Sequence, residues 1–296
     1  MNTQPLVSVR LVTYNHEKYI AQCLEGILMQ RTDFPFEVIV GEDCSTDRTR
    51  EIVLAYAARY PDKLRVLPAE ANLGHMRNSY RVQQACRGKY HAMIEGDDYL
   101  IDPLKLQLQA DFMEAHPDVS LCFHNALILN EKHAATRLFF ENAPAEILDF
   151  PAAYQMTLPT ASQMARADVL ATLPEWRLKI LCGDLLFRLW CAHHGNLGYL
   201  NRIMSVYRRH GGGLDASTYA QGPRAYYDDV LFIYREFDQA TQLTRTNLIQ
   251  REIARMQEDL LRQQTRRWYF LLRPRYIVVR LREYANWIYR NKQLLG

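Results

Sequence analysis

The chain has 296 residues, of which 48% are hydrophobic and 23% are charged, so it can bury a sizeable core and is not a disordered or low-complexity protein. It has no run of about 18 apolar residues that would cross a membrane, no signal-peptide pattern at its start, and no CxxC or zinc spacing among its six cysteines. With a formal net charge of +3, this composition predicts a cytoplasmic protein with reduced thiols, either fully soluble or peripheral at a membrane.

The first hundred residues alternate strand-like and helix-like segments. Short runs rich in β-branched residues predict strands over residues 6–12, 36–41, 64–67 and 90–94. Apolar residues at helical spacing predict helices over residues 20–28, 52–60 and 79–86. Ser45-Thr46-Asp47 offers side-chain oxygens that cap the second helix. Strands alternating with helices predict an α/β fold with a mainly parallel twisted sheet, flanked by helices on both faces.

The pattern is less regular beyond Asp98. The expected elements are a helix from Asp102-Pro103 to about His116, a strand over 119–123, loops with short elements over 130–159, and helices over 184–194 and roughly 223–265. The last helix carries one apolar stripe, formed by Ile249, Ile253, Met256 and Leu260. We expect a larger α/β domain over residues 1–220 and a helical C-terminal extension over residues 221–296.

Chemically active side chains follow three of the predicted strands. They are Tyr14-Asn15 after the first strand, Glu42-Asp43 after the second and Glu95-Gly96-Asp97-Asp98 after the fourth. Each group alone has an ordinary structural explanation as a turn, a helix cap or an exposed loop. Because ligands of open α/β sheets bind beyond the carboxyl ends of the strands, the three groups are expected at one rim. Acids gathered there repel one another, and a bound Mg²⁺ or Mn²⁺ would relieve that repulsion.

Three segments carry a specific resemblance. SVRLVTYNHEKYIAQCLEGILMQ, FEVIVGEDCSTDRT and GKYHAMIEGDDYLIDPLKL resemble the inverting family 2 glycosyltransferases, closely to about residue 125 and more thinly to about residue 213. The resemblance implies the GT-A fold, which is the fold of nucleotide-diphospho-sugar transferases. It also implies a nucleotide-diphosphate sugar as donor, with a UDP-sugar favoured, and Mg²⁺ or Mn²⁺ as cofactor.

The resemblance assigns roles within the three groups. Tyr14 would stack on the nucleotide base, Asp43 would bond the edge of the base, and Asp97 would face the ribose. Asp98 would bind the metal, and Arg77, after the Asn72-Leu73-Gly74 turn, would contact the diphosphate. The donor-binding set implied in this way is Thr13, Tyr14, Asn15, Glu17, Asp43, Arg77, Glu95 and Asp97. The family often has Asp at the position of Glu95, so the role of Glu95 stays open.

Two later positions extend the resemblance. Gly183-Asp184 is similar to the family's (E/D)D motif at the start of a helix, where the Asp is the general base. A helix-capping aspartate is the competing interpretation. His210, before three glycines, matches a position where GT-A enzymes often place a histidine on the metal or the diphosphate. Without the family pattern, His210 would be taken for a surface residue.

The predicted activity is transfer of a sugar, with inversion, to a saccharide or lipid-linked saccharide acceptor in the assembly of a bacterial-type surface polysaccharide. A sugar nucleotidyltransferase is a rival, but it needs a Gly-rich phosphate loop after the first strand, where TYNHEKY has no glycine. The second rival is a catalytically inactive scaffold that keeps the fold and binds a sugar or a membrane. Asp43, Asp97, Asp98 and Asp184 argue against this scaffold because all four acids are present.

The end of the chain has a different charge from the rest. Residues 262–296 hold nine Lys and Arg residues against the single acid Glu283, so the remainder of the chain is acidic. Within residues 266–296, aromatic residues alternate with arginines, and the segment from Tyr276 has the period of an amphipathic helix. This pattern predicts binding to anionic lipid on the cytoplasmic face of the inner membrane. A packed terminal helix or a dimer contact explains this pattern nearly as well, so the protein could form a homo-oligomer. Binding to nucleic acid is disfavoured because the rest of the chain is acidic.

Overall fold

The computed structural model describes residues 4–211, 223–242, 244 and 246–271, with side chains through residue 259 apart from those of residues 223 and 246. Its strands are β1 (Val7–Thr13), β2 (Phe36–Glu42), β3 (Leu64–Pro68), β4 (Tyr90–Glu95), β5 (Tyr99–Leu100), β6 (Val119–Asn130), β7 (Ala135–Leu138), β8 (Ile147–Leu148), β9 (Met164–Arg166) and β10 (Asn196–Arg209). Its α-helices are α1 (Ile20–Leu28), α2 (Thr49–Arg59), α3 (His75–Ala85), α4 (Lys105–Ala115), α5 (Phe150–Ala153), α6 (Ala167–Ala171), α7 (Gly183–His194), α9 (Pro223–Ala240) and α10 (Thr246–Leu271). Two 3₁₀ helices, η1 (Thr160–Ser162) and η2 (Glu175–Lys179), complete the described elements.

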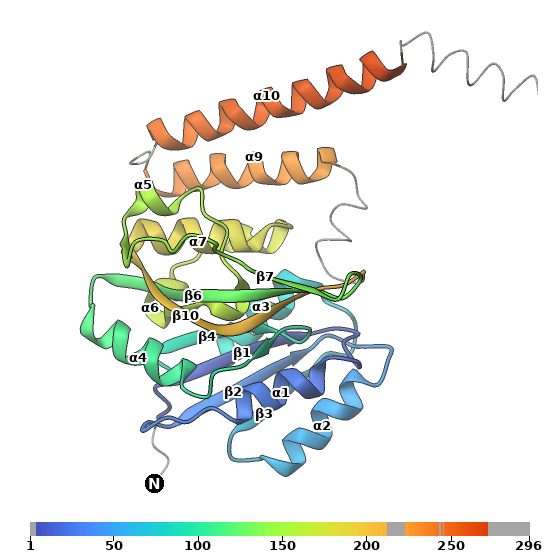
Figure 1. Ribbon diagram of the computed structural model, residues 1–296, viewed down its shortest axis with the longest axis vertical. Helices are drawn as coiled ribbons and strands as arrows, with labels where there is room; N and C mark the ends of the chain where they lie inside the picture. The colour runs from blue at the N-terminus through green and yellow to red at the C-terminus, as the bar shows by residue number, and fades with distance from the viewer. Residues whose placement is uncertain (1–3, 212–222, 243, 245, 272–296) are drawn as a thin grey trace, which may run out of the picture.

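The strands form one twisted sheet with helices on both faces (Figure 1). Its order is β3-β2-β1-β4-β9-β6-β10-β5, with β7 beside β6 and β8 beside β10. The long pairings of β1 with β2 and β4, of β2 with β3, and of β6 with β10 are parallel. The pairings of β5, β7, β8 and β9 are short and antiparallel. The predicted α/β class with a mainly parallel sheet is confirmed.

Alternation along β1 separates the two faces of the sheet. Val7, Val9 and Leu11 point into a core shared with α1, α2 and α4. Val12 packs on the opposite face with Ile39 of β2 and with α3. Arg10 points to this second face as well, since its guanidinium bonds to α3. A strand buried on both faces therefore carries one charged side chain in its middle.

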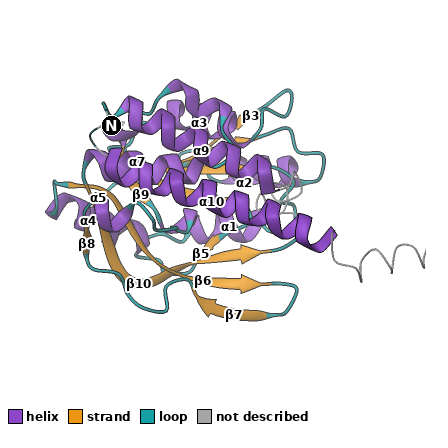
Figure 2. Cartoon of the chain, turned by 90° about the horizontal axis from the view of Figure 1, so that it is seen from above, coloured by secondary structure: helices purple, strands orange, loops and turns teal. Residues whose placement is uncertain are grey.

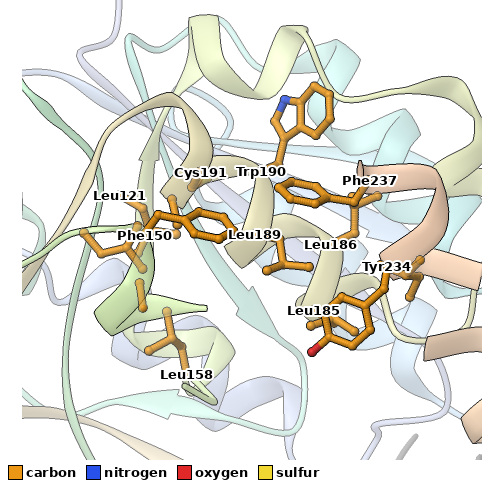
Figure 3. Close-up of a cluster of buried hydrophobic side chains, with 14 of the residues drawn as sticks. Leu121, Phe150, Leu158, Leu185, Leu186, Leu189, Trp190, Cys191, Tyr234 and Phe237 are labelled. Carbon is orange, nitrogen blue, oxygen red and sulfur yellow. The ribbon is translucent and has the colours of Figure 1, made fainter. Parts of the chain in front are cut away.

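The C-terminal helices pack on the α/β body. α9 lies against α7, and α10 runs back across α9 (Figures 1 and 2). Tyr234 and Phe237 of α9 share one apolar cluster with Leu186, Leu189 and Trp190 of α7 (Figure 3). Ile249, Ile253 and Met256 of α10 belong to the same cluster. The predicted domain boundary at residue 220 lies outside the described residues, but the helices that follow it share a core with the body.

Three predicted elements differ from the structure. α3, which contains most of residues 79–86, already begins at His75, and β6 continues to Asn130 because β10 and β7 pair with its second half. The predicted helix over 223–265 is two helices, α9 and α10. The chain reverses after Ala240, which allows the apolar stripes of both helices to reach one core. The side chain of Leu260 and the predicted amphipathic helix from Tyr276 lie outside the described residues.

Neither a membrane-spanning helix nor a disulfide occurs in the described part of the chain. None of its helices combines the length and the apolar character needed to span a bilayer. All six cysteines are free, so none takes part in a disulfide. Three of them, Cys23, Cys122 and Cys191, are buried, and burial raises the pKa of each of these thiols. These three thiols are therefore neutral at physiological pH.

Candidate functional site

The carboxyl ends of β1, β2 and β4 meet at one rim of the sheet. Thr13 at the end of β1 pairs in register with Glu42 of β2, and Val12 pairs with Glu95 of β4. The main-chain N–H of Asp43 donates to the carbonyl of Thr13 over 3.1 Å. The polar groups that follow these three strands therefore lie next to one another, as the parallel sheet predicts.

Gly96 allows the acidic motif at residues 95–98 to pack directly on the loop after β1. A Cβ atom at this position would lie 2.5 Å from Oγ1 of Thr13 and 2.7 Å from Nδ1 of His16. These two side chains are themselves in contact, with Oγ1 of Thr13 and Nδ1 of His16 3.2 Å apart. Any side chain at residue 96 would therefore push the acidic motif away from β1.

Asp97 lies between two histidines. Its Oδ2 is 3.0 Å from Nε2 of His210 and 3.8 Å from Nε2 of His16. Its Oδ1 is buried and has no hydrogen-bond partner among the described residues. Burial acts to raise the pKa of Asp97, but the hydrogen bond to His210 and the charge of His16 outweigh it, so the pKa is lowered. Asp97 is therefore ionised at neutral pH and has one oxygen available for a ligand.

Asp98 is 1% exposed and lies deeper than Asp97. Its Oδ1 accepts the main-chain N–H of Arg208 over 2.8 Å, and its buried Oδ2 has no partner among the described residues. Burial, followed by the charges of Asp97 and Glu95, raises the pKa of Asp98 well above its usual value. The hydrogen bond of His210 is made to Asp97, so the assignment of Asp98 to the metal stays a prediction.

Arg208 of β10 connects the acidic motif to α1 and to the turn after β6. Its Nε donates to the carbonyl of Asp97 over 2.8 Å, its Nη1 to Oε1 of Glu131 over 2.9 Å, and its Nη2 to Oε1 of Gln22 over 2.7 Å. Its guanidinium also covers the ring of Tyr19, with 4.7 Å from Cζ to the ring centroid. This network holds the end of β10 against the motif.

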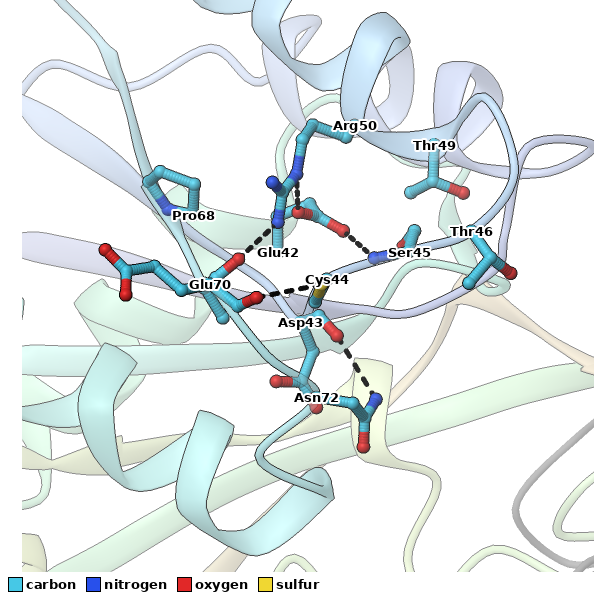
Figure 4. Close-up of polar contacts among 12 residues, drawn as sticks. Glu42, Asp43, Cys44, Ser45, Thr46, Thr49, Arg50, Pro68, Glu70 and Asn72 are labelled. Carbon is cyan, nitrogen blue, oxygen red and sulfur yellow. Dashed lines mark hydrogen bonds and ion pairs between the residues drawn. The ribbon is translucent and has the colours of Figure 1, made fainter.

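Asp43 holds the turn that precedes α3. Its Oδ1 accepts the main-chain N–H of Leu73 over 2.8 Å, and its Oδ2 accepts that of Gly74 over 3.0 Å. The side-chain amide of Asn72 donates to the carbonyl of Asp43 over 3.1 Å (Figure 4). A carboxylate can accept about four hydrogen bonds, so Asp43 keeps capacity for another donor. Its contact with a nucleotide base stays a prediction.

The loop after β1 contains three more of the predicted donor residues. Tyr14 is 41% exposed, as a stacking surface for a base requires. Oδ1 of Asn15 accepts the main-chain N–H of Thr46 over 2.8 Å, and Oε2 of Glu17 accepts that of Arg48 over 3.1 Å. Asn15 and Glu17 therefore join this loop to the one before α2. Their contact with a donor sugar stays a prediction.

Asp184 is exposed in the first turn of α7 and lines a cavity of about 100 Å³. Glu95 and His75 line the same cavity, with 3.9 Å between Oε1 of Glu95 and Nε2 of His75. Burial lowers the pKa of His75, while the charge of Asp184 acts in the opposite direction. A Cβ atom at Gly183 would lie 2.4 Å from Sδ of Met76, so α7 begins in close contact with α3.

Some residues were placed differently from expectation or were missed. Arg77 is exposed on α3 and is not among the residues that line this cavity, so its phosphate contact stays a prediction. The sequence reasoning missed His75, Arg208 and the buried Arg10, which also lines the cavity. A charged residue within the β-branched run of β1 was the available signal for Arg10. His75 and Arg208 gave no comparable signal because their partners are distant in the chain.

The rim offers few ligands for a divalent cation. The described part of the chain contains no group of three or more His, Cys, Asp or Glu side chains arranged to hold a metal ion. Asp97 and His210 do provide two neighbouring ligand side chains and one unpaired buried carboxylate oxygen. Mg²⁺ typically binds through one or two carboxylates and is completed by substrate phosphates. The residues therefore fit a cation shared with a diphosphate, and they do not form an all-protein site.

Comparison with known proteins identifies relatives of this chain. The family model described as Glycosyl transferase family 2 matches residues 8–164. An uncharacterized protein of Mycobacterium tuberculosis is 34% identical over 222 residues, which are 72% of this chain and 61% of that protein. The poly(ribitol-phosphate) β-N-acetylglucosaminyltransferase TarS of Staphylococcus aureus is 34% identical over 141 residues, 46% of this chain and 24% of that enzyme. The chain thus matches less than two thirds of the length of either relative.

Solved structures show the same fold. Residues 1–349 of S. aureus TarS in complex with UDP-GlcNAc superpose with a TM-score of 0.61 and 22% identity, covering 79% of this chain and 70% of that one. The mannosyltransferase PcManGT of Pyrobaculum calidifontis, in complex with GDP-Man and Mn²⁺, gives a TM-score of 0.58 at 15% identity over 94% of this chain and 83% of that one. At such identities the similarity shows the GT-A fold and does not carry over the substrates.

Proposed function

This chain belongs to glycosyl transferase family 2, and from that premise we propose that it transfers a sugar, with inversion, from a nucleotide-diphosphate sugar to a saccharide or lipid-linked saccharide acceptor. The observation that carries the proposal is one rim where Asp97 bonds to His210 and an exposed Asp184 shares a cavity with Glu95. Such acceptors occur in the assembly of bacterial-type surface polysaccharides. We favour a UDP-sugar as donor, because the TarS structure contains UDP-GlcNAc. The PcManGT structure, which is less similar in sequence, contains GDP-Man instead.

Asp184 is the proposed general base. As an acceptor hydroxyl attacks the anomeric carbon, Asp184 takes the hydroxyl proton, and the nucleoside diphosphate leaves from the opposite face. The configuration inverts in this single displacement, and no covalent intermediate forms. Asp184 is exposed and therefore accessible to an acceptor, and it lies in the first turn of α7, where the helix dipole favours negative charge.

The resemblance implies Asp98 and His210 as the protein ligands of the cation; because His210 bonds to Asp97, we propose Asp97 in place of Asp98 as the carboxylate that acts with His210. Mg²⁺ or Mn²⁺ bound there would neutralise negative charge that develops on the departing diphosphate. Arg208, two residues before His210, donates from Nε to the carbonyl of Asp97 and from its own main-chain N–H to Asp98, so it holds the end of β10 against the motif. Asp98 supports the motif from beneath by accepting the N–H of Arg208.

A thermal-shift panel tests the donor site. Purified protein is heated with UDP, GDP, CDP, dTDP or CMP, each in the presence of Mn²⁺, Mg²⁺ or EDTA. A ligand that binds only the folded state stabilises it by about 2.7 kcal/mol at a hundredfold excess over Kd. We expect UDP with Mn²⁺ to give the largest rise in Tm and EDTA to remove most of it. No rise with any nucleotide would instead favour the inactive sugar- or membrane-binding scaffold.

The basic C-terminal segment belongs to the proposal as a membrane contact. Its support is the sequence pattern of residues 266–296, because residues 272–296 lie outside the described part of the chain. Attraction to an anionic surface is worth about 1 kcal/mol per basic residue. Removing residues 266–296 should therefore abolish pelleting with phosphatidylglycerol vesicles and leave pelleting with phosphatidylcholine vesicles at background. Unchanged pelleting of the truncated protein would leave a packed helix or a dimer contact as the role of this segment.

A further inference from the structure

The cavity beside Asp184 contains a buried positive charge. Arg10, in the middle of β1, is 6% exposed and lines this cavity. Its Nη2 donates to Oγ of Ser79 over 2.9 Å and to the Ser79 carbonyl over 3.2 Å. Its Nε and Nη1 are buried and have no hydrogen-bond partner among the described residues. Most of the hydrogen-bonding capacity of this guanidinium is therefore unused.

A second buried arginine lines the same cavity. Arg177 of η2 is 7% exposed, and its Nη1 donates to the carbonyl of Leu173 over 2.7 Å. Its guanidinium covers the ring of Tyr80, with 4.7 Å from Cζ to the ring centroid. Burial is the main cause that lowers the pKa of Arg10 to about 10, and the charge of Arg177 acts in the same direction. Both groups are therefore charged at neutral pH, and they repel each other.

No ion pair between described residues neutralises either guanidinium. Glu95 and Asp184 line the same cavity, but Glu95 lies against His75, and the charge of Asp184 acts on His75 and Arg188. A buried charge without a partner is costly, so buried charges in proteins are normally paired. Arg10 thus lacks the anion that this rule requires, and Arg177 has only the charge of Glu175 acting on it without a close ion pair.

The size of the cavity limits what this anion can be. A volume of about 100 Å³ is well below the roughly 300–1,000 Å³ typical of a pocket for a whole drug-sized ligand. The cavity therefore accepts a substituent of a larger molecule rather than a nucleotide. Asp184 and Glu95 line it as well, so under the proposed transfer the cavity lies beside the reacting sugar.

We propose that the cavity between β1, α3 and η2 binds an anionic substituent, a carboxylate or a phosphate, of the sugar substrate, with Arg10 and Arg177 as its recognition residues. The inference rests on the proposed glycosyl transfer, because that transfer places a sugar beside Asp184. It makes the substrate class an acidic sugar. The anionic group belongs either to the donor sugar or to the acceptor, and binding experiments separate these two sources.

Ligand binding by wild-type protein and Arg10→Met tests the proposal. The first arm compares free glucuronate and glucose 6-phosphate with glucose by ligand-observed NMR. The second arm compares UDP-glucuronate with UDP-glucose by calorimetry in the presence of Mn²⁺. We expect the acidic ligand to bind about tenfold more tightly than its neutral counterpart in at least one arm. The neutral ligand lacks the anionic group and therefore cannot accept a charged hydrogen bond from Arg10. Arg10→Met should abolish this preference and leave the affinity for UDP unchanged.

The controls separate the possible failures. Arg59→Met removes an exposed arginine of α2 and should preserve the preference. Arg177→Met removes the second guanidinium and should also abolish the preference for the acidic ligand. This variant provides an answer if Arg10→Met does not fold.

A preference seen only with free sugars assigns the anionic group to the acceptor, and a preference seen with UDP-glucuronate assigns it to the donor. Equal affinity for acidic and neutral ligands in both arms, or a preference that survives in both variants, overturns the proposal. If the protein does not bind UDP, the proposed sugar transfer is wrong. The free-sugar arm then still tests whether the cavity prefers an acidic sugar.

Discussion

Asp184→Asn should lower the rate of sugar transfer by about 10²–10⁴-fold, the usual contribution of a positioned general base, while nucleotide binding stays intact. An amide has nearly the same shape as a carboxylate but cannot take the hydroxyl proton at neutral pH. Asp184 is exposed at the start of α7, so the exchange removes no buried contact. Loss of its charge near a helix N-terminus costs only about 0.3–1 kcal/mol of stability. The variant should therefore fold and bind UDP normally.

The measurement is release of UDP from the donor in the presence of acceptor, together with Tm and the affinity for UDP. Asp168→Asn is the matched control, because Asp168 is also an exposed acid in the first turn of a helix, α6. That variant should lose a similar amount of helix stabilisation and keep full activity. Near-normal turnover by Asp184→Asn would show that Asp184 only stabilises its helix. Equal losses in both variants would point to the helices rather than to proton transfer.

Asp97→Asn should abolish the effect of Mn²⁺ on UDP binding, whereas Asp98→Asn should retain much of it. Asp97 is the acid that bonds to His210, and it has an unpaired oxygen beside that contact. An amide at residue 97 removes the negative charge that a divalent cation requires. At residue 98 an amide oxygen can still accept the N–H of Arg208.

The difference between Tm with Mn²⁺ and Tm with EDTA, at a fixed excess of UDP, measures this effect. For wild-type protein the stabilisation is about 2.7 kcal/mol at a hundredfold excess over Kd, and Asp97→Asn should lose most of it. Asp111→Asn, an exposed acid of α4, serves as the control for removal of one negative charge. The reverse ranking, with Asp98→Asn losing the Mn²⁺ effect and Asp97→Asn keeping it, would restore Asp98 as the metal ligand. It would also remove the pair formed by Asp97 and His210 from that role.

The class of fold and the rim where the chemistry lies could both be predicted from local sequence pattern. Those features depend on local pattern: strand and helix periods are set by neighbouring residues, and the parallel order brings the carboxyl ends of strands together. Thr13, Glu42 and Glu95 could be placed at one rim for this reason, and register pairs confirm their adjacency. The motif Glu95-Gly96-Asp97-Asp98 also carries its own steric requirement, since Gly96 fits against Thr13.

Tertiary structure alone decided which of these side chains meet. His210 lies 113 residues beyond Asp97 along the chain, and its contact depends on how β10 ends beside the motif. Arg10 and Arg177 share a cavity because β1, α3 and η2 converge, which no local pattern encodes. The two C-terminal helices fold back on α7 for a similar reason, since their apolar stripes find a common core only in three dimensions. Contacts between residues far apart in sequence are decided by packing and electrostatics of the whole chain, and they determine the partners of each charged side chain.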